Sequence, residues 1–273
     1  MPYASTPDGP LYFEILDQVP PWRPAPEAIV FHHGIAADVH LWTHWVPVLA
    51  PYYRLVRFDM RGFGRSSIPG EGAKWTFDAL VDDLLTIADA AGAPRFHLVG
   101  ESIGGTAAIA CALHAPHRLI TLCLSNSAAR GGLVGNVASW ADEVARSGQS
   151  GWAAQMMARR FHDGALAADL YAWYLDLHAR CSMSATLGLA RLLLDSDLTD
   201  RLAEIGVPTL LLSPDGSPFI PAQVMAGMRE KIPNAELQVF AHSRHGLPLS
   251  HGSECAAKLL DFLARRAAAA NRG

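Results

Sequence analysis

The chain has 273 residues, half of them hydrophobic, and a formal net charge of −4. This length can bury a large core, either in one domain with an insertion, which we favour, or in two small domains. Charges of both signs are scattered, so there is no basic patch for nucleic acid or an anionic membrane, and no apolar run approaches the ~18 residues of a membrane span. The first seven residues also lack the pattern of a secretion signal. We therefore expect a cytoplasmic protein with a small-molecule partner, and the oligomeric state stays open, a homo-oligomer included.

Short apolar runs typical of buried strands recur along the chain, with helical periodicity between them. Residues 3–17 predict a hairpin around the turn at Asp8 and Gly9. Further strands are expected at 28–32, 53–59, 96–99, 121–125, 209–213 and 235–240. Helices are expected at 78–91, 106–113, 222–231 and 254–266, and the tail 265–273 reads as a fraying helix end. The alternation of strand and helix predicts an α/β fold, a mostly parallel sheet with helices on both faces.

The alternation stops between residues 128 and 200, where Ala, Leu, Met and Trp dominate and no strand-like run occurs. We expect this segment to be an inserted helical cap on a core formed by 1–127 and 201–273. Trp140, Trp152 and Met156 are candidates for lining a substrate pocket, although apolar residues at helical spacing more often form the core of the cap itself.

The segment Gly100-Glu101-Ser102-Ile103-Gly104 places a serine between a predicted strand and a predicted helix. The glycines on either side lack Cβ atoms, so strand and helix can approach closely while the serine hydroxyl projects outward. A Gly-x-Ser-x-Gly pattern alone is weak and is compatible with a structural turn. Its position between strand and helix favours Ser102 as a nucleophile.

A serine nucleophile needs a base, a group that holds the base, and N–H donors for the oxyanion. Catalytic groups of α/β proteins gather at the carboxyl ends of strands, so we considered residues just after each strand. After the last strand, His245 is followed by a glycine and is the expected base, with His242 in reserve. After the preceding strand, Asp215 is the expected acid, although Asp-Gly is also an ordinary turn.

The oxyanion donors are expected to be main-chain groups. His33-Gly34-Ile35 follows an early strand, and a turn at the glycine can direct the Ile35 N–H into the cleft. The second donor would be the Ile103 N–H, at the start of the helix after Ser102. For the His33 side chain we favour packing beneath the loop. The four cysteines are widely separated in apolar surroundings, which indicates buried small side chains and no metal site.

Together these residues resemble the α/β-hydrolase superfamily, and within it the small bacterial esterase, lactonase and carbon–carbon hydrolase group with a helical cap. The resemblance spans nearly the whole chain and includes the segment from Asp59 to Ser66. It implies the order serine, acid, histidine and no metal or organic cofactor. The chain departs from the family at the acid, because Ser217 stands before Pro218 where relatives usually carry aspartate. Three alternatives stay open: the acid is Asp215 in a shifted loop, the acid comes from another strand end, or the triad is reduced to a dyad of serine and histidine.

We therefore expect a serine hydrolase that cleaves a small carboxylic ester or enol-lactone through an acyl-enzyme on Ser102. Two alternatives stay open. The first is hydrolysis of a carbon–carbon bond in a vinylogous diketone, which relatives with the same elbow perform. The second is a catalytically reduced ligand-binding protein on the same scaffold, which the missing aspartate before Pro218 supports.

Overall fold

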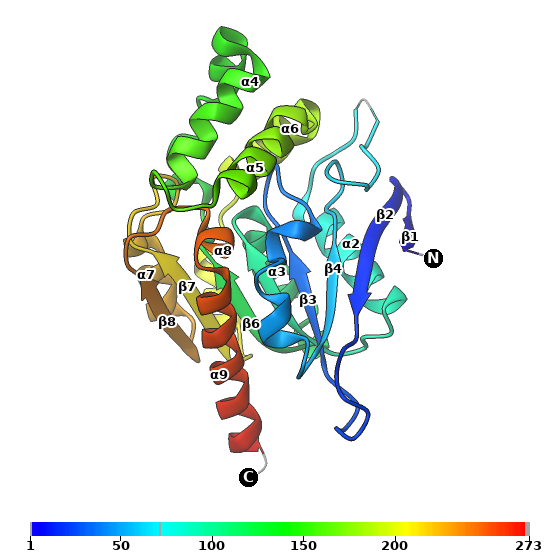
Figure 1. The fold of residues 1–273 in the computed structure, drawn as a ribbon. Helices are drawn as coiled ribbons and strands as arrows, with labels where there is room; N and C mark the ends of the chain where they lie inside the picture. Colours follow the sequence, from blue (N-terminus) through cyan, green and yellow to red (C-terminus); the bar gives the residue numbers. More distant parts are fainter. Residues whose placement is uncertain (1, 71, 271–273) are drawn as a thin grey trace.

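The computed structural model describes residues 2–70 and 72–270, in which eight strands form one sheet (Figure 1). The sheet order is β1-β2-β4-β3-β5-β6-β7-β8. The strands are β1 (Tyr3–Thr6), β2 (Gly9–Leu16), β3 (Ala28–His32), β4 (Arg54–Phe58), β5 (Phe96–Glu101), β6 (Leu119–Ser125), β7 (Thr209–Pro214) and β8 (Ala235–Phe240). β1 pairs antiparallel with β2, and β2 antiparallel with β4, whereas all other pairs are parallel. The predicted hairpin and mostly parallel sheet are therefore confirmed.

Helices cover both faces of the sheet. The α-helices are α1 (Val46–Leu49), α2 (Phe77–Ala90), α3 (Ile103–His114), α4 (Trp140–Arg160), α5 (Ala168–Arg180), α6 (Met183–Leu194), α7 (Ala222–Lys231), α8 (Leu247–Ser250) and α9 (Gly252–Ala270). Short 3-10 helices are η1 (Val39–Trp42), η2 (Pro116–Arg118), η3 (Gly131–Leu133) and η4 (Thr199–Glu204). Within the described ranges, no helix combines the length and hydropathy needed to cross a bilayer.

The central strand β3 shows why both faces are covered. Val30 packs in the hydrophobic cluster that includes α2, α3 and α7, whereas its neighbours Ile29 and Phe31 pack in the cluster that includes α1, α8 and α9. All three side chains are fully buried. Because successive side chains of a strand point to opposite faces, a continuous apolar run indicates a strand with two cores, as the sequence predicted.

Helices α4, α5 and α6 lie together beyond one end of the sheet (Figure 1). They occupy the stretch between β6 and β7 for which we expected a helical cap. The division into a core and a cap of residues 128–200 stays a prediction, although the helical character of the stretch agrees with it. At the C-terminus, α9 continues to Ala270, so residues 265–270 are regular helix, and 271–273 lie outside the described residues.

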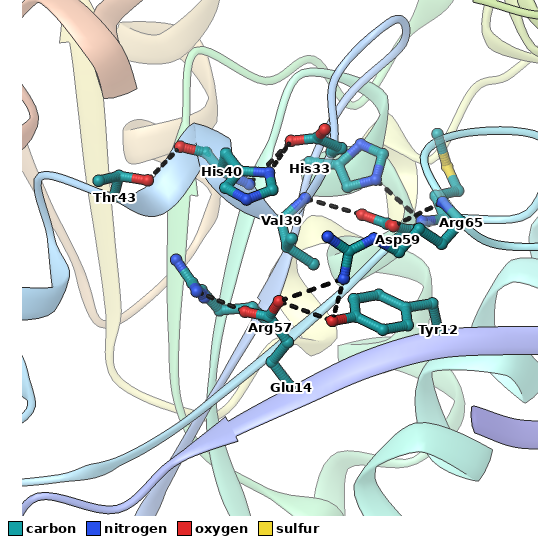
Figure 2. A network of polar contacts seen from close by, with 11 residues as sticks. Tyr12, Glu14, His33, Val39, His40, Thr43, Arg57, Asp59 and Arg65 are labelled. Carbon is teal, nitrogen blue, oxygen red and sulfur yellow. Dashed lines mark hydrogen bonds and ion pairs between the residues drawn. The ribbon is translucent and has the colours of Figure 1, made fainter. Parts of the chain in front are cut away.

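A polar network joins the loops that follow β3 and β4 (Figure 2). The Asp59 carboxylate accepts hydrogen bonds from the N–H groups of Val39 and Arg65, both at 2.8 Å. His33 accepts the Met60 N–H at Nε2, at 2.9 Å, and its Nδ1 lies 2.7 Å from the Gly34 oxygen. The His33 side chain therefore braces these loops from beneath, the packing role that we favoured.

The same loop is tied to α2 by a buried ion pair. Arg61 donates from Nε and Nη2 to the two oxygens of Asp83, at 2.5 and 2.6 Å. Both side chains are at most 5% exposed. Breaking a buried pair leaves one charge without a partner, which typically costs about 3–5 kcal/mol.

We predict that Asp83→Ala lowers the free energy of unfolding by about 3 kcal/mol, since Arg61 keeps the half-exposed Asp8 as its counter-charge and one hydrogen bond to the Ala79 oxygen. Urea denaturation followed by circular dichroism measures the change. The control is Asp176→Ala, which breaks a pair with Arg180 that is exposed on both sides and should change little. Similar small losses in both variants would contradict a stabilising role for the buried pair.

Candidate active site

Ser102 lies between β5 and α3 in a backbone conformation that residues other than glycine rarely adopt. Its φ is 54° and its ψ is −124°. The strained turn is held by a hydrogen bond from the Ser102 N–H to the Ser125 oxygen, at 3.1 Å. A Cβ on Gly104 would lie 2.4 Å from the His32 oxygen, so only glycine permits this approach of helix and strand. The predicted sharp turn is present, and it directs the Ser102 hydroxyl away from the sheet.

The structure brings Ser102 and His245 together. His245 Nε2 lies 3.2 Å from Ser102 Oγ, and both side chains are at least nine-tenths buried. The ring packs against Phe219 with centroids 4.8 Å apart, and the next residue, Gly246, donates its N–H to the Arg160 oxygen. Burial, then the positive charge of Arg160 and then His178, hold the His245 pKa well below its ordinary value. The imidazole is therefore neutral and able to accept a proton.

The other ring nitrogen does not face the acid that we expected. The Asp215 carboxylate accepts hydrogen bonds from the N–H groups of His242 and Ser243, at 2.9 and 3.0 Å, and the side chain is exposed. These hydrogen bonds, that of Ser243 first, hold the Asp215 pKa below its ordinary value. The expectation that Asp215 faces His245 is thus corrected. Asp215 and Gly216 form a turn that is hydrogen-bonded to the loop after β8, and an ordinary turn was the alternative that the sequence had left open. His242 also lies on the surface.

Asn126 and Ser217 occupy the place of the acid. The Asn126 amide nitrogen lies 2.5 Å from His245 Nδ1, and Ser217 Oγ lies 3.5 Å from the same nitrogen. Asn126 directly follows β6 and is fully buried, with a φ of 44°. Its backbone N–H donates to Leu212 on β7 at 2.9 Å. Ser217, the position before Pro218 at which the resemblance implied an aspartate, therefore lies beside the histidine, and Asn126 reaches the same nitrogen from another strand end.

The two expected oxyanion donors border the same space. Ile35 lines the pocket beside Ser102, and Ile103 begins α3 directly after it. In the part of the chain that the structure describes, neither backbone N–H donates to another backbone group. The Ile35 oxygen is held by Arg160, whose Nη2 donates to it at 3.3 Å. Both N–H groups therefore have no backbone acceptor among the described residues. Their role as oxyanion donors stays a prediction.

A buried acidic side chain stands next to the serine. The Glu101 carboxylate lies 3.5 Å from His245 Nε2 and 3.9 Å from Arg160 Nη1, and Glu101 is 2% exposed. Burial raises the pKa of Glu101 to about 7, against the opposing effects of Arg160 and the Gly34 N–H. A Cβ on Gly34 would lie 2.3 Å from a Glu101 oxygen, so glycine is needed for this carboxylate to fit.

The pocket beside Ser102 is narrow and mostly apolar. Its lining consists of Ile35, Ser102, Val134, Val137, Trp140, Arg160, Leu193, Phe219 and His245. The free space is about 10 Å³, room for at most about one water molecule. Of the three expected lining residues only Trp140 is present. Trp152 and Met156 are fully buried within the hydrophobic core, where helical periodicity turns them inward. Among the described residues, no group of three or more His, Cys, Asp or Glu could hold a metal ion.

Three residues at the site were missed or undervalued in the sequence. Asn126 directly follows β6, just as Asp215 directly follows β7, but only carboxylates were expected in the role of the acid. Glu101 is an acidic residue in an otherwise apolar and glycine-rich elbow, which is a usable signal for a functional group. Arg160, buried at the end of α4, carries no such signal, because arginines on helices are usually solvated.

We predict that Glu101 makes stability depend on pH. Its pKa of about 7 lies above the ordinary 4.5, so its stabilising contribution is complete below pH 4.5 and is lost as pH rises through 7. The unfolding free energy of wild type minus that of Glu101→Gln should therefore fall by roughly 2–3 kcal/mol between pH 5 and pH 8, because only wild type must ionise a buried carboxyl group. Arg160, His245 and Tyr174 face the carboxyl group and are kept in both proteins.

Urea denaturation at the two pH values gives this difference. Glu230→Gln, on the exposed face of α7, controls for the loss of one negative charge. A pH-independent difference for Glu101→Gln would show that the carboxyl group is not protonated in the folded protein near neutrality.

Comparison with known proteins shows the family of the chain. The family model described as alpha/beta hydrolase fold matches residues 27–251. The chain is 28% identical over 197 residues to 3-oxoadipate enol-lactonase 1 of Acinetobacter baylyi, covering 70% of this chain and 71% of the relative. It is 25% identical to the putative carbamate hydrolase RutD of Stutzerimonas stutzeri, covering 94% and 97%. A hydrolase structure from Pseudomonas aeruginosa PA01 superposes with a TM-score of 0.85 at 26% identity, covering 96% of this chain and 97% of that one. The predicted fold and resemblance are confirmed, and the chain belongs to the alpha/beta hydrolase fold family.

Proposed function

We propose that the protein is a serine hydrolase that cleaves a small carboxylic ester or enol-lactone through an acyl-enzyme on Ser102. The observation that carries the proposal is the 3.2 Å contact between Ser102 Oγ and His245 Nε2 at a strained strand-to-helix turn. A turn with no chemical role does not need its serine hydroxyl beside a buried, neutral imidazole. The names of relatives, an enol-lactonase and a putative carbamate hydrolase, support acyl transfer.

In this mechanism, His245 Nε2 accepts the hydroxyl proton as Ser102 Oγ bonds to the substrate carbonyl carbon. The carbonyl oxygen becomes an oxyanion, for which the Ile35 and Ile103 N–H groups are the proposed donors. His245 then gives its proton to the leaving oxygen as the carbon–oxygen bond breaks. Water attacks the acyl-enzyme with His245 again as base, which releases the acid and restores the serine.

The lining of the pocket limits the substrate. Val134, Val137 and Leu193 offer apolar contacts for a small acyl group, and the Arg160 guanidinium is the one cationic group of the lining. The free space of about 10 Å³ holds about one water molecule, so an ester can bind only after the lining opens. The proposal therefore includes a movement of α4, α6 and the loop around Phe219 away from one another, a motion typical of enzymes that close over a ligand.

We predict that Ser102→Ala and His245→Ala each lower the turnover of a small p-nitrophenyl ester by orders of magnitude, because nucleophile and base act as a unit. A fluorophosphonate should label the wild-type protein and leave Ser102→Ala unlabelled. Ser150→Ala and His117→Ala, both exposed and outside the pocket lining, are the matched controls.

Circular dichroism checks that the variants keep the fold. Full activity of Ser102→Ala would refute the proposal. A wild-type protein that is neither labelled nor active on esters, but binds small acids, would favour the ligand-binding alternative. Cleavage of a vinylogous diketone in place of esters would favour carbon–carbon hydrolysis on the same serine.

A further inference from the structure

We propose that Asn126, supported by Ser217, takes the place of the triad acid and holds His245 in the tautomer that can activate Ser102. The inference rests on the proposed function and extends it. It starts from the contact at His245 Nδ1, where a neutral amide at 2.5 Å and a hydroxyl at 3.5 Å stand in place of a carboxylate.

Two carboxylates near the histidine can be excluded from this role by position. Asp215 is exposed and hydrogen-bonded to the backbone of His242 and Ser243. Glu101 lies 3.5 Å from Nε2, the nitrogen that must face Ser102, and therefore cannot hold Nδ1 at the same time. Within the described part of the chain, Nδ1 contacts Asn126 and Ser217.

The tautomer of His245 decides whether it can act as a base. If Nδ1 carries the proton, the Nε2 lone pair faces the Ser102 hydroxyl and can accept its proton. If an amide N–H donates to Nδ1, the proton of the neutral ring resides on Nε2, which then has no lone pair to accept the proton of Ser102. The wrong tautomer at such a site typically costs about 10⁴-fold in kcat.

Counting donors and acceptors around Ser217 favours the active tautomer. Ser217 Oγ already lies 3.3 Å from the Phe219 N–H and 3.1 Å from the Ile220 N–H, and the Asn126 nitrogen is a third donor at 3.1 Å. A hydroxyl oxygen accepts two hydrogen bonds and donates one. Three donors exceed this capacity, and the acceptor left for the hydroxyl proton is His245 Nδ1, which at 3.5 Å allows only a weak hydrogen bond.

Turning the Asn126 amide by 180° about χ2 removes the conflict. Its oxygen then accepts both the Ser217 O–H and the His245 Nδ1–H, while Ser217 Oγ keeps its two backbone donors. The amide nitrogen moves to the place where Oδ1 now has no hydrogen-bond partner. Each orientation thus leaves one amide atom unpaired, and the contacts of Ser217 and His245 decide between them.

The site that results has an orienting group without a negative charge. Arg160 and His178 both oppose the charging of His245, and Glu101 at Nε2 is the carboxylate that faces the ring. An acceptor oxygen at Nδ1 fixes the tautomer by hydrogen bonding alone. Introducing a carboxylate there should therefore raise the pKa of His245 and change the pH profile, which a purely structural asparagine would not do.

The experiment compares wild type with Asn126→Leu, Asn126→Asp and the double variant Asn126→Leu with Ser217→Asp. Asn126→Leu keeps the approximate size but not the acceptor, and kcat/KM for a p-nitrophenyl ester should fall by about 10²-fold or more. In the double variant, the carboxylate introduced at position 217 faces Nδ1 from the family's usual place and should restore activity by about tenfold or more. Asn126→Asp should stay active and shift the acid limb of the kcat/KM profile to higher pH.

Nitrogen-15 NMR of the wild-type imidazole reports the tautomer without relying on turnover. A proton on Nδ1 of His245 supports the proposal, and a proton on Nε2 overturns it. An undiminished kcat/KM in Asn126→Leu, or no recovery in a folded double variant, also overturns it. Failure of the proposed function is distinguishable, because it would show as no fluorophosphonate labelling of wild type whatever the tautomer.

Discussion

The backbone of Ser102 is the constraint on which the rest of the site depends. A φ of 54° at a serine is costly, and the surrounding chain must stabilise it. Strand β6 accepts the Ser102 N–H, and Gly104 lets α3 reach the backbone of the loop after β3. The same close approach brings the Ile35 loop beside the serine. One turn therefore fixes the positions of nucleophile, neighbouring strand end and proposed oxyanion donor together.

Burial is the second constraint, and it sets the electrostatics. His245, Glu101 and Arg160 are each 3% exposed or less, so the free energy of each charge depends on its immediate neighbours. Burial disfavours charge on the histidine and on the glutamate alike. The Glu101 carboxylate contacts His245 at Nε2, on the side of Ser102, and not at Nδ1 on the opposite side of the ring. In the proposed mechanism, the charged histidine is stabilised less than an aspartate at Nδ1 would stabilise it.

The sequence was sufficient to predict the fold, because most strands from β3 to β7 are short, mainly apolar runs, β8 alternates apolar and polar residues, and helical periodicity marks the main helices between them. It also predicted the meeting of Ser102 and His245, since strand order and loop glycines determine which loops share one edge. It failed at Asp215, where a residue two positions from the family's pattern turns toward the loop after β8. The position of the Asn126 side chain depends on its χ angles, and that of Arg160 on how α4 crosses the site. Local spacing in the sequence encodes neither.

The small volume of the closed pocket also has a kinetic consequence. If the open form is a minor population, the apparent dissociation constant of any substrate increases by the inverse of that fraction. Opening would then be a step shared by all substrates. Esters with phenols of very different acidity would react at nearly one rate wherever opening is slower than acylation. The helices above Ser102 would thus determine the speed of the reaction as well as which acyl groups enter.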